Sequence, residues 1–184
     1  MSLLYDAARA MPPDREARFR AVYEALYPSV RRYVARLLGG TAQADDVSQD
    51  MFARLWQEML ADREPQSERA WVFRAATNAA INVSKSRQRS ARLDVVAHAE
   101  QQRLAVQVDP ERTAILRDIV QRALARVPDP MRQCLLLYHE GLTGREIAEV
   151  LGVARSYVGT LVVRAHDRFR RECEALGDCH DLFG

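Results

Sequence analysis

The sequence is poor in several residue types, and each shortage excludes a class of protein. Its three cysteines, Cys134, Cys173 and Cys179, are an odd number that forms no paired disulfide framework, which fits a reducing cytosol. No apolar run approaches the roughly 20 residues that span a bilayer, and the first residues lack the cationic start and apolar length of a signal peptide. We therefore expect a protein of the bacterial cytoplasm that does not insert into the membrane.

Residue patterns that carry catalysis are also missing. The four histidines lie in unrelated contexts, and there is no phosphate-binding glycine loop, HExxH pair or nucleophile elbow. The adjacent Asp45 and Asp46 stand where acids open a helix, and there they usually interact with the helix dipole and do no more. We predict neither an enzyme nor a bound cofactor.

Lysine is nearly absent, since Lys85 is the only one, and arginine supplies almost all of the positive charge. The formal net charge of +2 conceals an uneven distribution along the chain. Acidic residues dominate between positions 41 and 68, whereas every charged residue between positions 69 and 92 is basic. The first segment suits a basic partner, and the second suits a polyanion.

Apolar residues follow helical spacing along most of the chain, and no segment alternates convincingly enough for a strand. The spacing predicts helices up to the glycine pair at 39–40, over about 47–60, over 68–87, and again from Pro110 onward. Between about 86 and 110 the pattern fades. The sequence therefore predicts an all-α protein with two small helical bundles, residues 15–88 and 110–173, joined by a flexible linker over 89–109.

Residues 143–169, TGREIAEVLGVARSYVGTLVVRAHDRF, have the pattern of a helix-turn-helix. Thr143 and Glu146 have the spacing of a capping box, Ala148 allows the two helices to cross closely, and Gly152 permits the positive φ of the turn. An ordinary helical hairpin with solvated arginines is the alternative. The residues predicted to face the major groove of DNA are Arg145, Arg155, Ser156, Tyr157, Thr160, Arg164 and Arg168.

The segment AWVFRAATNAAINVSKSRQR, residues 70–89, interleaves basic residues with aromatic rings and amides. This composition suits single-stranded DNA, because arginines follow phosphates, rings stack on bases, and Asn78 and Asn82 can read base edges. Trp71 and Phe73 are explained equally well as core residues of an amphipathic helix.

The order of these segments resembles the extracytoplasmic-function sigma factors of bacterial RNA polymerase. ADDVSQDMFARLWQ is followed by the basic segment, a linker, and LARVPDPMRQCLLLYHEGLTGREIAEVLGVARSYVGTLVVRAHDRF, and the resemblance runs from about Phe19 to Arg171. It implies that the first domain docks on the clamp of the largest subunit and captures the melted minus-ten element of the promoter DNA. The second would dock on the flap of the second-largest subunit and read the minus-thirty-five element. An anti-sigma factor, whether or not it is membrane-anchored, would hold the chain inactive.

The resemblance also assigns residues to surfaces. The helix-turn-helix residues given above match the minus-thirty-five set, and residues 62–68 match a loop that pockets a flipped minus-ten base. Gly159, Thr160 and Leu161 stand where the family commonly has Lys-Ser-Arg, so the promoter sequence does not follow from relatives. The clamp-binding set is Asp45, Asp46, Gln49, Asp50, Phe52, Leu55 and Trp56. The minus-ten set is Arg63, Trp71, Arg74, Asn78, Asn82, Lys85 and Arg87.

Two other interpretations stay open at this point. A stand-alone helix-turn-helix regulator would bind duplex DNA without polymerase, but such proteins usually dimerise, and no coiled-coil seam or dimer face is evident. A metal- or redox-responsive sigma factor would sense through Cys173, Cys179 and His180, a weak pattern because it contains no CxxC pair.

Overall fold

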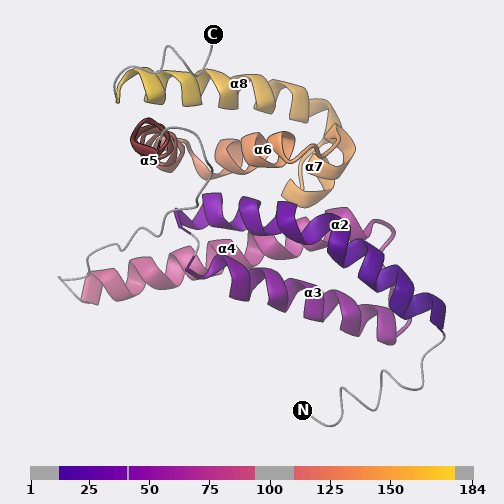
Figure 1. The fold of residues 1–184 in the computed structure, drawn as a ribbon. Coiled ribbons are helices and arrows are strands. Elements are labelled where there is room, and N and C mark those ends of the chain that lie inside the picture. The colour runs from indigo at the N-terminus through magenta and orange to yellow at the C-terminus, as the bar shows by residue number, and fades with distance from the viewer. Residues whose placement is uncertain (1–12, 41, 94–109, 177–184) are drawn as a thin grey trace.

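The computed structural model describes residues 13–40, 42–93 and 110–176, and within these ranges the chain is helical with no strand (Figure 1). This confirms the predicted all-α class. One bundle consists of α2 (Pro13–Leu38), α3 (Ala44–Leu60) and α4 (Glu68–Leu93). The other consists of α5 (Pro110–Arg126), α6 (Asp129–His139), α7 (Gly144–Leu151) and α8 (Arg155–Glu174).

Helix ends fall where turn residues predict them, with one difference. α2 stops before Gly39, whose φ of 72° is costly for residues with a side chain, and α6 starts after Pro128 with a second proline in its first turn. α4 continues to Leu93, past the predicted end at Arg87, because residues 88–93 contain no proline or glycine to stop it. The rest of the predicted linker, residues 94–109, lies outside the described residues.

The core of the first bundle contains one polar pair among large apolar side chains. Tyr33 and Phe73 are fully buried, and their rings meet edge to face at 5.4 Å. Thr77 Oγ1 donates to the carbonyl of Phe73 at 2.7 Å, so the Tyr33 hydroxyl, 2.7 Å from Thr77 Oγ1, is the donor of that second bond. Both hydroxyls are therefore satisfied inside the core, which removes the penalty of burying them unpaired.

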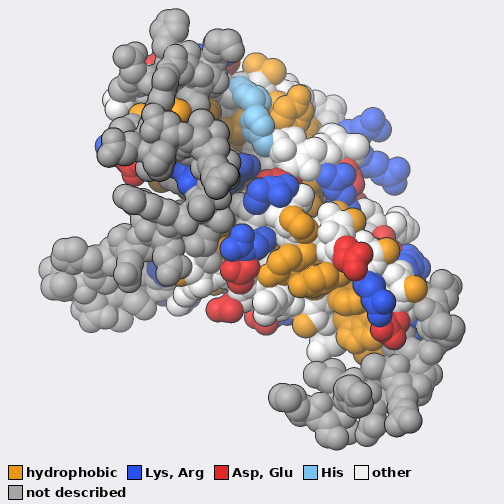
Figure 2. All heavy atoms as spheres, in the orientation of Figure 1, with side chains coloured by type: hydrophobic (Ala, Val, Ile, Leu, Met, Phe, Trp, Pro, Cys, Tyr) orange, Lys and Arg blue, Asp and Glu red, His pale blue; other side chains and the backbone are white. Residues whose placement is uncertain are grey.

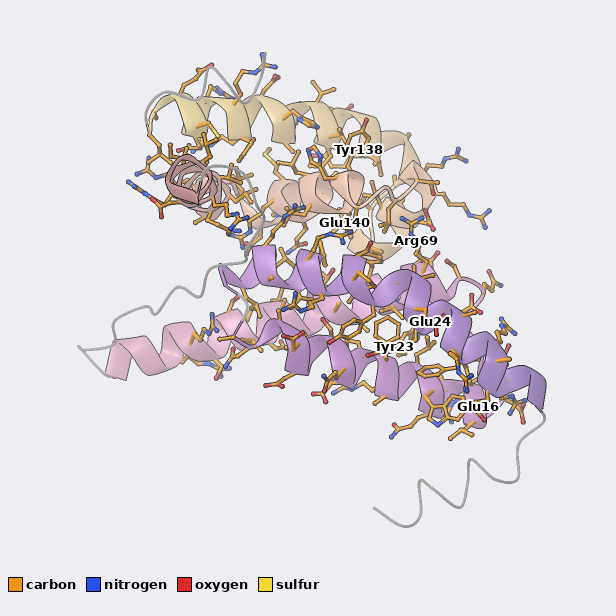
Figure 3. The ribbon with its side chains drawn as sticks, viewed as in Figure 1. Glu16, Tyr23, Glu24, Arg69, Tyr138 and Glu140 are labelled. Carbon is orange, nitrogen blue, oxygen red and sulfur yellow. The ribbon has the colours of Figure 1, made fainter. Side chains whose placement is uncertain are left out.

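The two bundles pack on each other through α4 against α7 and α2 against α6 (Figure 1). Their buried side chains form one contiguous apolar cluster. At the junction the carboxylate of Glu140, with 3% of its side chain exposed, lies 3.0 Å from Arg32 and 3.3 Å from Arg36 of α2. Arg69 of α4 donates to the Glu140 carbonyl at 2.8 Å, and Figure 3 shows Arg69 and Glu140 between the bundles. Each bundle is thus stabilised by the other.

Candidate functional site

The helix-turn-helix has the local geometry that the sequence predicts. Thr143 Oγ1 accepts from the Glu146 amide at 3.3 Å, and Glu146 Oε2 accepts from the Thr143 amide at 2.7 Å, which completes the capping box. Gly152 ends α7 in the left-handed conformation with φ 66°. Ile147 and Ala148 of α7 are buried. These contacts fix the angle at which α8 leaves the turn.

The outer side of α8 is open to solvent, while Val158, Leu161 and Ala165 form its buried side. Arg145 on α7 is exposed too, and Figure 2 shows basic side chains at the α7–α8 end of the upper bundle. The exposed residues of α8 that the sequence predicted are Arg155, Ser156, Tyr157, Thr160 and Arg164, with Tyr157 42% exposed. Within the described ranges none of these arginines forms an ion pair, so their donors remain available.

Arg168 differs from this exposed set. It is half-buried, and its guanidinium pairs with Glu172 of the same helix at 2.6 Å. Gly159 is exposed, and a side-chain methyl group there would meet nothing within 4 Å. Glycine inside a helix costs about 1 kcal/mol relative to alanine. Because the space beside Gly159 is open, packing inside the chain does not explain a glycine at this position.

The predicted clamp-binding residues of α3 separate into two groups. Asp46, Gln49 and Asp50 are exposed. Phe52 and Leu55 are 1% and 0% exposed and belong to the core of their own bundle, so the structure does not present them on the outer side of α3 with those three residues.

Two further residues of that predicted set contact α2. Trp56 is half-buried, with its ring 4.8 Å from that of Phe19. Asp45 pairs with Arg31 and accepts from the Tyr27 hydroxyl at 3.2 Å. The hydrogen bond from Arg31 holds the pKa of Asp45 below its usual value. Asp45 therefore holds α3 against α2. The other two acids of the clamp-binding set, Asp46 and Asp50, have no such partner among the described residues.

A groove of about 450 Å³ runs between α3 and α4. It brings together four residues of the predicted minus-ten set, Trp71, Arg74, Asn78 and Asn82. Phe73 is fully buried, whereas Trp71 is half-buried at the groove, so the two rings have different roles. The groove is also lined by Asp50 and Arg54 of α3.

Arg54 is the lining residue that sequence reasoning missed. The only signal for it was the spacing of positions 47, 50, 51 and 54, which share one side of α3 facing α4.

The remaining basic residues of the minus-ten set lie in different surroundings. Lys85 is exposed. Arg87 donates to the carbonyl of Leu38 at 3.1 Å and to the side chain of Gln43 at 2.9 Å, so it fastens the end of α2. Arg63 pairs with Glu58 at 3.0 Å. These two arginines have partners inside the chain, and Lys85 has none among the described residues.

The residues considered for metal binding do not form a site in the described part of the chain. Cys173 is buried against Ala123, and Cys179 and His180 lie outside the described residues. No group of three histidine, cysteine or acidic side chains is placed to hold a metal ion in residues 13–40, 42–93 and 110–176. None of the described helices has the length and apolarity that crossing a membrane requires.

Comparisons with known proteins match both bundles. The family model for sigma-70 region 2 matches residues 22–90, and the model for sigma-70 region 4 matches residues 117–167. The ECF RNA polymerase sigma factor SigL of Mycobacterium tuberculosis is 34% identical over 156 residues, which cover 82% of this chain and 84% of that protein.

Two solved structures share the fold. The sigma factor RpoE, in complex with the anti-sigma factor NepR from Bartonella quintana, has a TM-score of 0.68 at 20% identity and covers 85% of this chain and 96% of its own. CnrH, in complex with the cytosolic domain of CnrY, has a TM-score of 0.65 at 21% identity and covers 93% of this chain and 94% of its own.

Proposed function

Because this chain belongs to the extracytoplasmic-function sigma factors of RNA polymerase, with regions 2 and 4 of the sigma-70 family, we propose how its surfaces divide the work of promoter recognition. The observation that carries the proposal is the outer side of α8, where the predicted arginines lie exposed and unpaired among the described residues. The match to region 2 argues against a stand-alone helix-turn-helix regulator, because such a regulator needs only the second bundle.

In the proposal, α3 docks on the clamp of the largest polymerase subunit. Asp46 and Asp50 lie four residues apart and are both exposed, with Gln49 beside them. Such a row of acids is complementary to a basic helix. The second bundle docks on the flap of the second-largest subunit, an assignment supported by the family resemblance.

We assign the promoter DNA to two other surfaces. The groove between α3 and α4 takes the melted minus-ten strand, since Trp71 offers a stacking face, Arg74 a cation for phosphate, and Asn78 and Asn82 base-reading amides. The outer side of α8, with Arg145, enters the major groove at the minus-thirty-five element. Arg168 is left out of this reading surface because Glu172 holds it.

Regulation by an anti-sigma factor is part of the proposal. The sigma factor RpoE was solved in complex with the anti-sigma factor NepR, and CnrH in complex with the cytosolic domain of CnrY, which supports a bound regulatory partner here, either membrane-anchored or not. The chain would work in the cytoplasm beside polymerase and contribute no catalysis of its own.

The test of polymerase docking is Asp50→Arg in the full chain, with affinity for core polymerase as the measurement. We expect binding to be lost and thermal stability to stay nearly unchanged, because Asp50 is exposed. Glu24→Arg, the same charge change at an exposed position of α2, is the matched control. Unaltered core affinity of Asp50→Arg would rule out α3 as the docking surface.

A further inference from the structure

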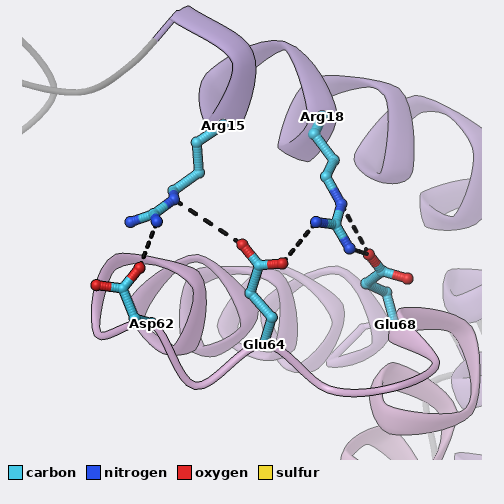
Figure 4. A network of polar contacts seen from close by, with 5 residues as sticks. All are labelled: Arg15, Arg18, Asp62, Glu64 and Glu68. Carbon is cyan, nitrogen blue, oxygen red and sulfur yellow. Dashed lines mark hydrogen bonds and ion pairs between the residues drawn. The ribbon is translucent and has the colours of Figure 1, made fainter.

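Five charged side chains connect the start of α2 to the α3–α4 loop, residues 61–67 (Figure 4). Arg15 pairs with Asp62, and its Nε lies 3.9 Å from Glu64 Oε1. Arg18 pairs through Nη1 with Glu64 at 2.5 Å and donates through Nε to Glu68 Oε1 at 3.1 Å. Two arginines of one helix thus hold the middle of the loop and the first residue of α4.

The loop backbone turns at the same point. Asp62 has φ 53°, the one positive value at a residue other than glycine in the described ranges. Aspartate tolerates this left-handed conformation better than most residues do. The amide of Asp62 donates to the Met59 carbonyl at 3.3 Å, and the amide of Arg63 donates to the Glu58 carbonyl at 2.9 Å. Arg15 therefore holds the side chain of the residue on which the shape of the loop depends.

The electrostatics of the loop also depend on these arginines. Asp62, Glu64 and Glu68 together would repel the phosphates of an approaching DNA strand. Each of the three carboxylates faces a guanidinium of α2. The hydrogen bond to Glu68 raises the pKa of Arg18. Glu68 also lies one helical turn before Trp71, a residue of the α3–α4 groove.

We infer that Arg15 and Arg18 are positioning residues for minus-ten recognition, which hold the α3–α4 loop in the shape that receives a flipped base and neutralise its carboxylates. The inference rests on the proposed function, in which the α3–α4 groove takes the melted minus-ten strand, and on the family resemblance, by which residues 62–68 pocket a flipped base. It adds a specificity role for two residues at the start of α2, a segment that the surfaces proposed above do not use.

The experiment uses holoenzyme reconstituted from core polymerase and the full chain, with transcription from a promoter library randomised at the minus-ten element. In Arg18→Ala we expect about a tenfold loss of discrimination at one base position, because a flipped base is read only in a formed pocket. Arg20→Ala is the matched control, since Arg20 is exposed on the same helix and pairs with Glu16 of α2 at 2.8 Å. It should leave base preference unchanged.

Two further variants separate position from charge. Arg18→Lys keeps the charge but loses the fork that bonds to both Glu64 and Glu68, so it should lose part of the discrimination. Arg18→Glu combined with Glu68→Arg should recover part of the base discrimination that Arg18→Ala loses. These variants and Asp62→Asn, which keeps the tolerated backbone conformation, decide the question if thermal melting shows that Arg18→Ala is unfolded.

Each outcome either supports or overturns the inference. Equal loss on all promoters with unchanged base preference would mean that Arg18 contacts phosphate or only stabilises the fold, and the positioning role would be wrong. Unchanged transcription and preference in Arg18→Ala would overturn it as well. Wild-type chain that fails to direct core polymerase to any library promoter would instead refute the proposed function, so the two failures are distinguishable.

Discussion

The arginines at the junction of the two bundles and those on the outer side of α8 are the same residue type in opposite situations. Arg32 and Arg36 direct their donors at the buried carboxylate of Glu140. Arg155 and Arg164 lie exposed, and within the described ranges they meet no carboxylate. The difference teaches that in an arginine-rich chain the function of a basic residue depends on whether the chain already satisfies its donors. The first pair should matter for stability and the second for binding.

The largest expected effect comes from breaking the junction. Arg32→Ala combined with Arg36→Ala should lower the free energy of unfolding of the full chain by about 3 kcal/mol, because it leaves a buried carboxylate without side-chain partners. Glu140→Gln should cost less, about 1 kcal/mol, since the half-exposed arginines can then turn to water. The measurement is urea unfolding followed by circular dichroism. A larger loss for Glu140→Gln than for the double variant would contradict the comparison.

The outer side of α8 should show the reverse behaviour. Arg164→Ala should weaken binding to the cognate minus-thirty-five sequence by about 1–3 kcal/mol and relax preference at one base pair, if its guanidinium reads a guanine edge. Its free energy of unfolding should change by less than about 0.5 kcal/mol, as expected for an exposed residue. Promoter-library transcription checks the first expectation and urea unfolding the second.

Arg155→Ala is the control for this prediction, because Arg155 opens α8 and is expected to contact phosphate. Its loss should weaken all sequences alike and reduce the salt dependence of binding. If Arg164→Ala behaves in the same uniform way, the reading must instead depend on Tyr157 and Thr160.

The smallest expected effect is a dependence of the free energy of unfolding on pH, which we assign to His139. Its ring lies 5.4 Å from that of His166 and 6.0 Å from that of Tyr138. Partial burial lowers the pKa of His139, and His166 and Arg36 lower it further. The nearby Glu140 opposes this shift, because it raises the pKa of His139. As the pH falls through the ordinary value of about 6.5, the unfolded chain takes up a proton that the folded chain does not. The free energy of unfolding should therefore fall slightly from pH 7 toward the lowered pKa.

The measurement is urea unfolding at a series of pH values. His139→Gln should flatten this dependence, and Tyr138→Phe, which keeps the neighbouring ring, should leave it unchanged. An equal slope in His139→Gln and wild type would exclude His139 as its source.

Periodicity and turn chemistry predicted the helices and the helix-turn-helix well, because these depend on residues a few positions apart. The capping box of Thr143 and Glu146 and the left-handed Gly152 are examples. The same periodicity put Phe52 and Leu55 on the apolar stripe of their helix, and both are buried, whereas the family resemblance placed them in the clamp-binding set. A stripe of apolar residues shows that one side of a helix is covered, but it does not distinguish the chain's own core from a partner.

The junction and the loop network were beyond sequence reasoning for a different reason. Arg32 and Glu140 are 108 positions apart, and Arg18 and Glu68 are 50 apart, so no local pattern relates them. Glu140 follows a helix end, where an acid has many ordinary explanations. The residue assignments on the clamp, minus-ten and minus-thirty-five surfaces remain predictions for the experiments above.

The packing of α7 on α4 has a consequence for the length of DNA that the chain can span. On the proposed assignment these neighbouring helices belong to the readers of two promoter elements centred about 25 base pairs apart, or about 85 Å along B-form DNA. Two packed helices have axes only about 10 Å apart, so on this assignment the packed chain holds the two reading bundles much closer together than the two elements lie. Binding at both sites requires the bundles to separate, and the free energy of that separation weakens the apparent promoter affinity. A ligand that favours the packed arrangement would therefore act as a repressor without touching either DNA-reading surface.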